Sequence, residues 1–87
     1  MSLMSLKAKI VMLTLDSTWI QHMALPFPPF PGLGIRVDTY EVLNVESVVV
    51  GDDSCDVTCI VRLEGVEPGL LTEKKCKALG FQAGDYP

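Results

Sequence analysis

Three cysteines and a single histidine are the residues of this sequence whose side chains could do nucleophilic or metal chemistry. Cys55 and Cys59 are four residues apart, which in a strand places both side chains on one face, about 13 Å from each other. This separation is too large for a disulfide or for two ligands of one zinc ion. A nucleophilic cysteine needs a base beside it, and nothing in the pattern brings His22 near Cys55, Cys59 or Cys76. We therefore interpret Cys55 and Cys59 as small buried residues and expect no catalytic residues.

Acidic residues around a glycine, at Asp52, Asp53 and Asp56 near Gly51, could in principle bind a cation. Calcium loops require more oxygen ligands at fixed spacing, and they typically close with a glutamate, which this segment does not match. A solvated hairpin turn explains the same residues, since glycine and aspartate favour turns. We expect neither a metal site nor a bound cofactor.

The most unusual segment is Pro26–Gly34, which contains four prolines within six residues and two phenylalanines. Prolines lack the amide hydrogens that a central strand or a helix interior needs, so the segment is predicted to be an extended, polyproline-like crossover. Phe27 and Phe30 would anchor it in the domain's own core or on a neighbouring chain. A peptide ligand for a groove-binding domain is a weaker alternative, because no basic residue flanks the prolines. The residues predicted to lie at an interface are Trp19, Phe27, Phe30 and Leu33.

The charge distribution disfavours nucleic acid as a partner. The net charge is −4, and between Asp38 and Glu67 there are eight acidic residues against one basic residue, Arg62. Nucleic-acid binding relies on a basic surface that neutralises phosphates. The three lysines Lys74, Lys75 and Lys77 are better explained as the solvated face of a helix.

The clearest secondary structure is a hairpin formed by Val45–Val50 and Cys55–Leu63. The second segment alternates strictly between apolar and polar residues, as in a strand with one buried face. Ile35–Val42 is predicted to be a strand that continues into Val45–Val50 through a bulge or bend near Leu43 and Asn44.

Two further strands are predicted before the crossover, at Leu6–Leu15 and, with a helical turn as the alternative, at Thr18–Leu25. The first is apolar on both faces for part of its length, which predicts cover on both sides. After the hairpin, a short helix begins at the N-cap Thr72 and ends before Gly80 at the C′ position. Residues 82–87 are predicted to be a tail.

Size and composition predict one domain over residues 1–87, with residues 1–3 as a possible cloning leader because Met-Ser-Leu is repeated at once. No apolar run approaches the roughly 20 residues of a membrane span, and no signal peptide is recognisable, so we expect a cytoplasmic protein without a membrane partner. Apolar residues make up 48% of the chain, which is high for so small a domain and favours a partner surface.

The order of three segments, Leu25–Ile35, Tyr40–Val42 and Val57–Leu63, resembles a class of short, uncharacterised bacterial and phage proteins with a small SH3-like or Sm-like barrel. In that class a proline–glycine segment is followed by a strand, a bend and a hairpin. The resemblance covers roughly residues 25–63 and implies a fold without functional residues. The Sm RNA-binding motifs are not recognisable.

The sequence thus predicts a mostly β fold: a small, strongly bent antiparallel barrel of about five strands with one short C-terminal helix. The predicted function is that of a non-enzymatic interaction or assembly module, a homo-oligomer that could also bind another protein. The alternative is an Sm-like oligonucleotide (RNA) binding protein, and a small enzyme ranks third.

Overall fold

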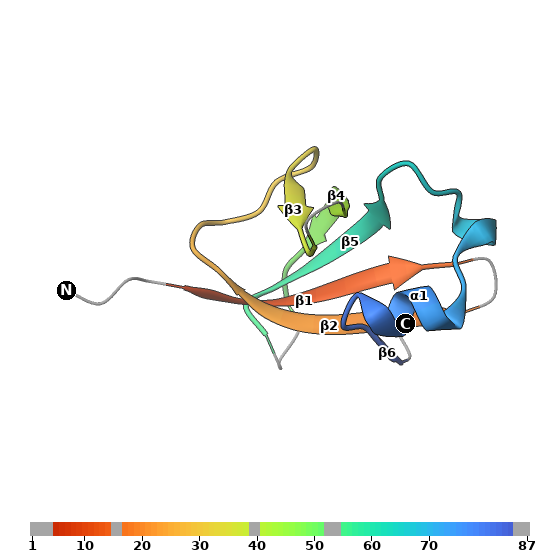
Figure 1. Ribbon diagram of the computed structural model, residues 1–87. Helices are drawn as coiled ribbons and strands as arrows, with labels where there is room; N and C mark the ends of the chain where they lie inside the picture. The colour runs from red at the N-terminus through yellow and green to blue at the C-terminus, as the bar shows by residue number, and fades with distance from the viewer. Residues whose placement is uncertain (1–4, 15–16, 39–40, 52–54, 85–87) are drawn as a thin grey trace.

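The computed structural model describes residues 5–14, 17–38, 41–51 and 55–84, so the possible leader at residues 1–3 lies outside the described residues. Six strands and two short helical segments follow one another along the chain (Figure 1). They are β1 (Leu6–Leu13), β2 (Thr18–Leu25), β3 (Gly34–Arg36), β4 (Val42–Val49), β5 (Val57–Leu63), the 3-10 turn η1 (Pro68–Leu70), α1 (Glu73–Ala78) and β6 (Gln82–Ala83).

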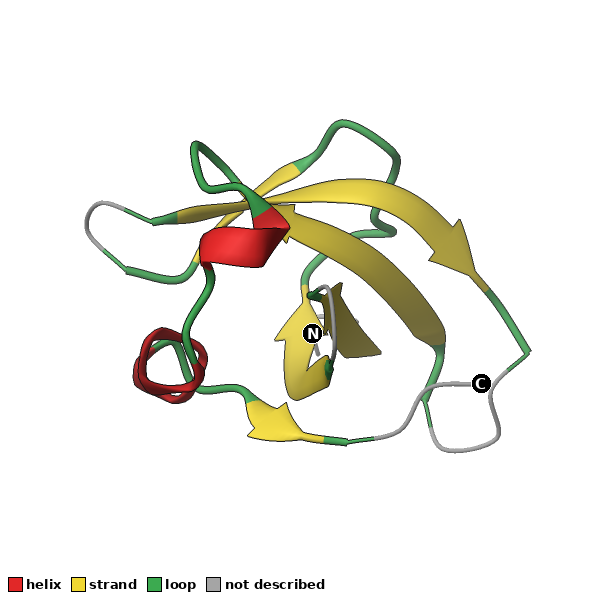
Figure 2. Cartoon of the chain, turned by 90° about the vertical axis from the view of Figure 1, so that its right-hand side faces the viewer, coloured by secondary structure: helices red, strands yellow, loops and turns green. Residues whose placement is uncertain are grey.

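All six strands belong to one sheet in the order β3-β4-β5-β1-β2-β6. The sheet curls into a half-barrel, as Figure 2 shows, and its two outermost strands, β3 and β6, do not pair with each other in the described structure. The mostly β fold with one short C-terminal helix is therefore confirmed. The details differ from the prediction, because β1 and β5 pair in parallel and β6 adds a sixth strand at the start of the expected tail.

The central position of β1 explains why this strand is apolar on both faces. Ile10 and Met12 face the core, whereas Val11 faces outward and is nevertheless fully buried. The registers place Ile20 of β2 and Ile60 of β5 on either side of Val11. Cross-strand neighbours thus account for this feature, which does not require a second chain.

The core lies on the concave side of the sheet and is closed by residues of the C-terminal segment. Cys76 of α1, together with Leu79 and Phe81 after it, joins the inward-facing residues of the central strands. The buried core residues are Ala8, Ile10, Met12, Trp19, Leu25, Leu43, Val45, Val57, Cys59, Val61, Leu63, Cys76, Leu79 and Phe81.

The prediction of one bent strand running from Ile35 into β4 was wrong. The segment forms two antiparallel strands, β3 and β4, joined by a tight turn in which Val37 N–H donates to the Glu41 carbonyl at 3.0 Å. Asp38, at the start of this turn, is a residue type that favours turns. The predicted bulge does exist, but it lies between Val45 and Ser47.

The helix boundaries are confirmed. The Thr72 hydroxyl accepts a hydrogen bond from the Lys75 amide at 3.1 Å, which makes Thr72 the N-cap. At the other end, Gly80 has a φ of +92°, and the amide of Phe81 donates to the Cys76 carbonyl at 3.1 Å. This pattern is the Schellman motif, which satisfies the last helical carbonyls and brings Phe81 back to the core.

Among the described residues, no helix has the length and apolar character that crossing a membrane would require.

Candidate interaction surface

The crossover between β2 and β3 ends in a rigid turn over residues 30–33. The Leu33 amide donates to the Phe30 carbonyl at 3.1 Å, and Gly32 has a φ of +96°. Proline at the second position and a glycine with positive φ at the third are typical of a type II turn. The backbone conformations that Pro31 and Gly32 favour therefore set the direction in which the chain turns at the end of the crossover.

Two contacts fasten this turn to the sheet. Gly32 N–H donates to the Val45 carbonyl at 2.8 Å, and Val45 N–H donates to the Leu33 carbonyl at 2.8 Å. Leu33 also packs against the core, and Pro29 is buried. The two hydrogen bonds to Val45 and the packing of Leu33 and Pro29 thus attach the end of the crossover to the sheet and the core.

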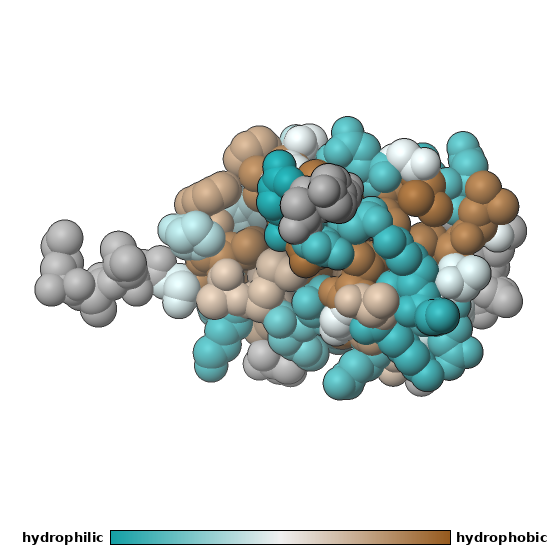
Figure 3. Space-filling model, viewed as in Figure 1, coloured by the Kyte–Doolittle hydropathy of each residue, from teal (hydrophilic) through white to brown (hydrophobic). Residues whose placement is uncertain are grey.

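Phe27 and Phe30 are half-exposed and do not belong to the hydrophobic core. Their exposed fractions are 47% and 52%, so the structure decides against the core placement that the sequence had left open. In Figure 3, brown hydrophobic surface covers the end of the molecule along which the crossover runs. Trp19 differs from both rings, because it is only 5% exposed and has almost no surface to offer to a second chain.

The end of β4 contributes further apolar surface to the same end of the sheet. Val49 and Val50 are 44% and 72% exposed. Val49 pairs with Thr58 near the start of β5, at the end of the sheet where β2 leads into the crossover. We call Phe27, Phe30, Val49 and Val50 the apolar end; the other large exposed apolar residues of the described structure are Leu13 and Leu70.

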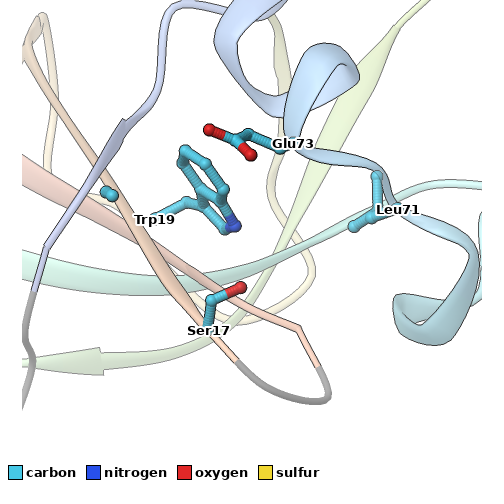
Figure 4. Close-up of a pocket in the computed structure, with 5 residues that line it drawn as sticks. Ser17, Trp19, Leu71 and Glu73 are labelled. Atoms are coloured by element: carbon cyan, nitrogen blue, oxygen red, sulfur yellow. The ribbon is translucent and has the colours of Figure 1, made fainter.

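One cavity is an open cleft of 390 Å³ between the β1–β2 hairpin and α1 (Figure 4). Ser17, Trp19, Leu71, Glu73 and Ala83 line it. Its polar side chains already have partners: the Ser17 hydroxyl lies 2.9 Å from the Thr14 hydroxyl, and the Glu73 carboxylate lies 2.7 Å from Lys77 Nζ. The hydrogen bond from Lys77 lowers the pKa of Glu73. Among the described residues that line this cleft there is no histidine, and the Glu73 carboxylate is paired with Lys77.

Another cavity, of 240 Å³, brings together two residues that sequence spacing had not connected. His22 and Cys55 both line it, with Lys7, Ala8, Met23 and Ala24. The Cys55 sulfur lies 3.7 Å from the Thr58 hydroxyl. The β1–β2 and β1–β5 pairings create this proximity, so no local pattern could have predicted it.

The other two cysteines are buried. Desolvation raises the pKa of the Cys59 thiol, with a further contribution from nearby Cys55, and desolvation also raises the pKa of Cys76. The interpretation of Cys55 as a buried residue was wrong, because Cys55 is partly exposed, whereas Cys59 and Cys76 are buried. The side chain of Cys76 is on the inner face of α1 and joins the core.

Two of the three clustered lysines are engaged in ion pairs. Lys75 Nζ binds the carboxylate of Glu41, which ties α1 to the end of the β3–β4 turn, and Lys77 pairs with Glu73. Of the acidic residues near Gly51, Asp52 and Asp53 lie outside the described residues, whereas Asp56 accepts a hydrogen bond from the Lys7 amide at 2.8 Å. The described residues contain no group of three or more potential metal ligands.

Comparisons of the chain with protein-family models, with curated proteins and with solved structures find no match. The resemblance to small SH3-like or Sm-like barrel proteins therefore stays a prediction.

Proposed function

We propose that this protein is a non-enzymatic assembly module that associates with further copies of itself through Phe27 and Phe30. The observation that supports the proposal is the half-exposure of both rings on a crossover whose backbone is held by Pro31, Gly32 and the bonds to Val45. A rigid loop loses little conformational entropy when it docks, and aromatic side chains are enriched at the centres of interfaces. Burying the exposed half of each ring would contribute about 2.5 kcal/mol.

The other predicted interface residues have different roles in this proposal. Trp19 lies in the core and Leu33 packs against it, so both would support the surface from beneath rather than contact the partner. RNA binding ranks second, because Lys75 and Lys77 already pair with carboxylates and leave little basic surface on α1 for phosphates.

The test is the mass in solution, measured by light scattering during size exclusion over a range of micromolar concentrations. We expect the wild-type mass to exceed the 9.5 kDa of one chain and to rise with concentration. Phe27→Asp and Phe30→Asp should each shift the protein towards the single-chain mass while its circular dichroism stays unchanged.

Leu70→Asp is the matched control, because Leu70 is 74% exposed but lies on η1, outside the apolar end. It should leave the assembly intact. A wild-type mass of 9.5 kDa at every concentration would refute the proposal. Dissociation by Leu70→Asp to the same extent as by the phenylalanine variants would also refute it, since any added charge would then suffice.

A further inference from the structure

The outer edge of β4 changes from covered to open at Val45. Up to that residue, β3 and the turn before it bond to the edge, ending with the contacts of Gly32 and Leu33 to Val45. The type II turn then reverses the chain, so the crossover leaves β4 at this point. Beyond Val45, no backbone hydrogen bond reaches this edge from the described part of the chain.

The pairing with β5 shows which backbone groups the open edge presents. In an antiparallel pair, alternate residues bond to the neighbouring strand, and those between them point their N–H and C=O to the other side. Val45 points outward, since it bonds to Gly32 and Leu33. The bulge inserts one residue before Ser47, which faces Ile60, and Val49 faces Thr58. Val48 therefore points its N–H and C=O outward, and Val50 would do the same.

The side chains of this segment favour strand pairing. Val48, Val49 and Val50 are β-branched, and residues 47–51 contain no proline and no charged residue. Charges and prolines are devices that natural proteins use to keep open edges from pairing. The nearest charges along the chain are those of Glu46, whose carboxylate lies 3.7 Å from Arg62, and of Asp52, which follows Gly51. Residues 47–51 of two copies can therefore meet in antiparallel orientation around Val49 without opposing like charges, and this register leaves Glu46 and Asp52 just outside the paired residues.

The exposed area of Phe27 and Phe30 alone is too small for a stable interface. Half of two phenylalanine side chains amounts to roughly 200 Å². A stable interface of standard size buries about 800 Å² on each partner. The open edge of β4 and its valines lie at the same end of the sheet as the start of the crossover and would extend the contact.

We infer that a second copy of this chain adds its residues 47–50 antiparallel to this edge, around a two-fold axis near Val49. Val48 would exchange backbone hydrogen bonds with Val50 of the second copy, and the two sheets would become continuous. Because the operation is a two-fold rotation, both copies use the same surface and the assembly closes as a dimer. This inference rests on the proposed self-association and specifies its geometry.

The test removes one amide hydrogen from the open edge. Val48→Pro removes the outward N–H of residue 48 without removing a hydrogen bond to β5. Because proline is tolerated on edge strands, the variant should fold, and it should have the mass of a single chain. Val48→Thr is the matched control: it keeps the N–H and the β-branched shape, and it should remain a dimer. Circular dichroism and thermal unfolding verify that both variants are folded.

Amide hydrogen exchange of the wild-type protein gives a second readout that needs no substitution. Exchange at Val48 should slow as the protein concentration rises, whereas exchange at Val49, which bonds to β5, should not depend on concentration. If Val48→Pro fails to fold, this measurement decides the question.

The outcomes separate the two proposals. A dimer that Phe30→Asp dissociates but Val48→Pro does not, with concentration-independent exchange at Val48, would overturn the edge pairing and leave the proposed function standing. A monomeric wild-type protein would overturn both. Slower exchange at Val48 on adding a valine-rich peptide of unrelated sequence to such a monomer would assign the edge to a foreign strand instead of a second copy.

Discussion

The amide of Gly32 and the carbonyl oxygen of Val45 are 2.8 Å apart, and this hydrogen bond marks where the crossover meets the sheet. On one side of it, β4 is covered by β3. On the other side, no backbone hydrogen bond from the described residues reaches the outer edge of β4, and the crossover turns away with Phe27 and Phe30 half-exposed. One contact thus separates the covered part of the sheet from the surface at which we expect assembly.

The backbone of Gly32 can be tested by substitution. Gly32→Ala should lower the free energy of unfolding by about 1–2 kcal/mol, because an L-residue is strained at positive φ. A Cβ atom there would meet nothing within 4 Å, so the loss would be due to the backbone alone. Gly80→Ala should cost a similar amount, because Gly80 also has a positive φ and its Cβ would lie 2.8 Å from Gln21 Nε2, the end of a flexible side chain that can move aside. Urea denaturation measures both; an unchanged stability in either variant would contradict the role of the left-handed backbone.

The three thiols should react in an order set by burial. Cys55 is partly exposed and lines a cavity, so it should be labelled first by a thiol reagent in the folded protein. Cys59 and Cys76 are buried and should react slowly until denaturant is added. Mass spectrometry of digested, partly labelled protein measures the order. Early labelling of Cys76 would show that α1 detaches from the core.

Stability should fall at alkaline pH. Burial raises the pKa of Cys59 and Cys76 above the ordinary thiol value of 9.0, so the folded protein releases these protons less readily than the unfolded chain. Their contribution to stability is fully present below pH 9.0 and is lost as the pH rises through the folded pKa values. The urea midpoint should therefore be lower at about pH 10 than at about pH 8.

Lysines and tyrosines also titrate near that range, so a control is needed. In Cys59→Ala and Cys76→Ala, stability should be lower at both pH values because a cavity forms, but its dependence on pH should be weaker. An unchanged pH dependence in both variants would assign the effect to other groups.

The two ion pairs of α1 should differ in strength. Glu41 and Lys75 are partly buried and join segments 34 residues apart, and a double-mutant cycle with Glu41→Gln and Lys75→Met should give a coupling of about 0.5–1 kcal/mol. The exposed pair of Glu73 and Lys77 should give a smaller coupling, which high salt should remove. The reverse order would mean that Glu41 does not hold α1 to the sheet.

Local patterns of the sequence were sufficient to determine several elements. Alternation predicted the β4–β5 hairpin, and Thr72 and Gly80 predicted both ends of α1, because a strand face or a helix cap depends on residues a few positions apart. The prolines of the crossover likewise predicted a segment without regular structure between β2 and β3. The bend expected near Leu43 was misplaced, since the turn at Asp38 divides this region into two strands.

Only the tertiary structure decided which distant strands pair and which apolar residues remain exposed. The parallel contact of β1 with β5 joins residues about 50 positions apart, and no local propensity encodes such a pairing. That contact makes β1 central, buries Val11 and brings His22 and Cys55 to one cavity. Trp19 and Phe30 are both aromatic in the sequence, yet one packs in the core and the other faces outward. The curl of the sheet and the turn at Gly32 make this difference, because burial depends on what the rest of the chain places opposite each side chain.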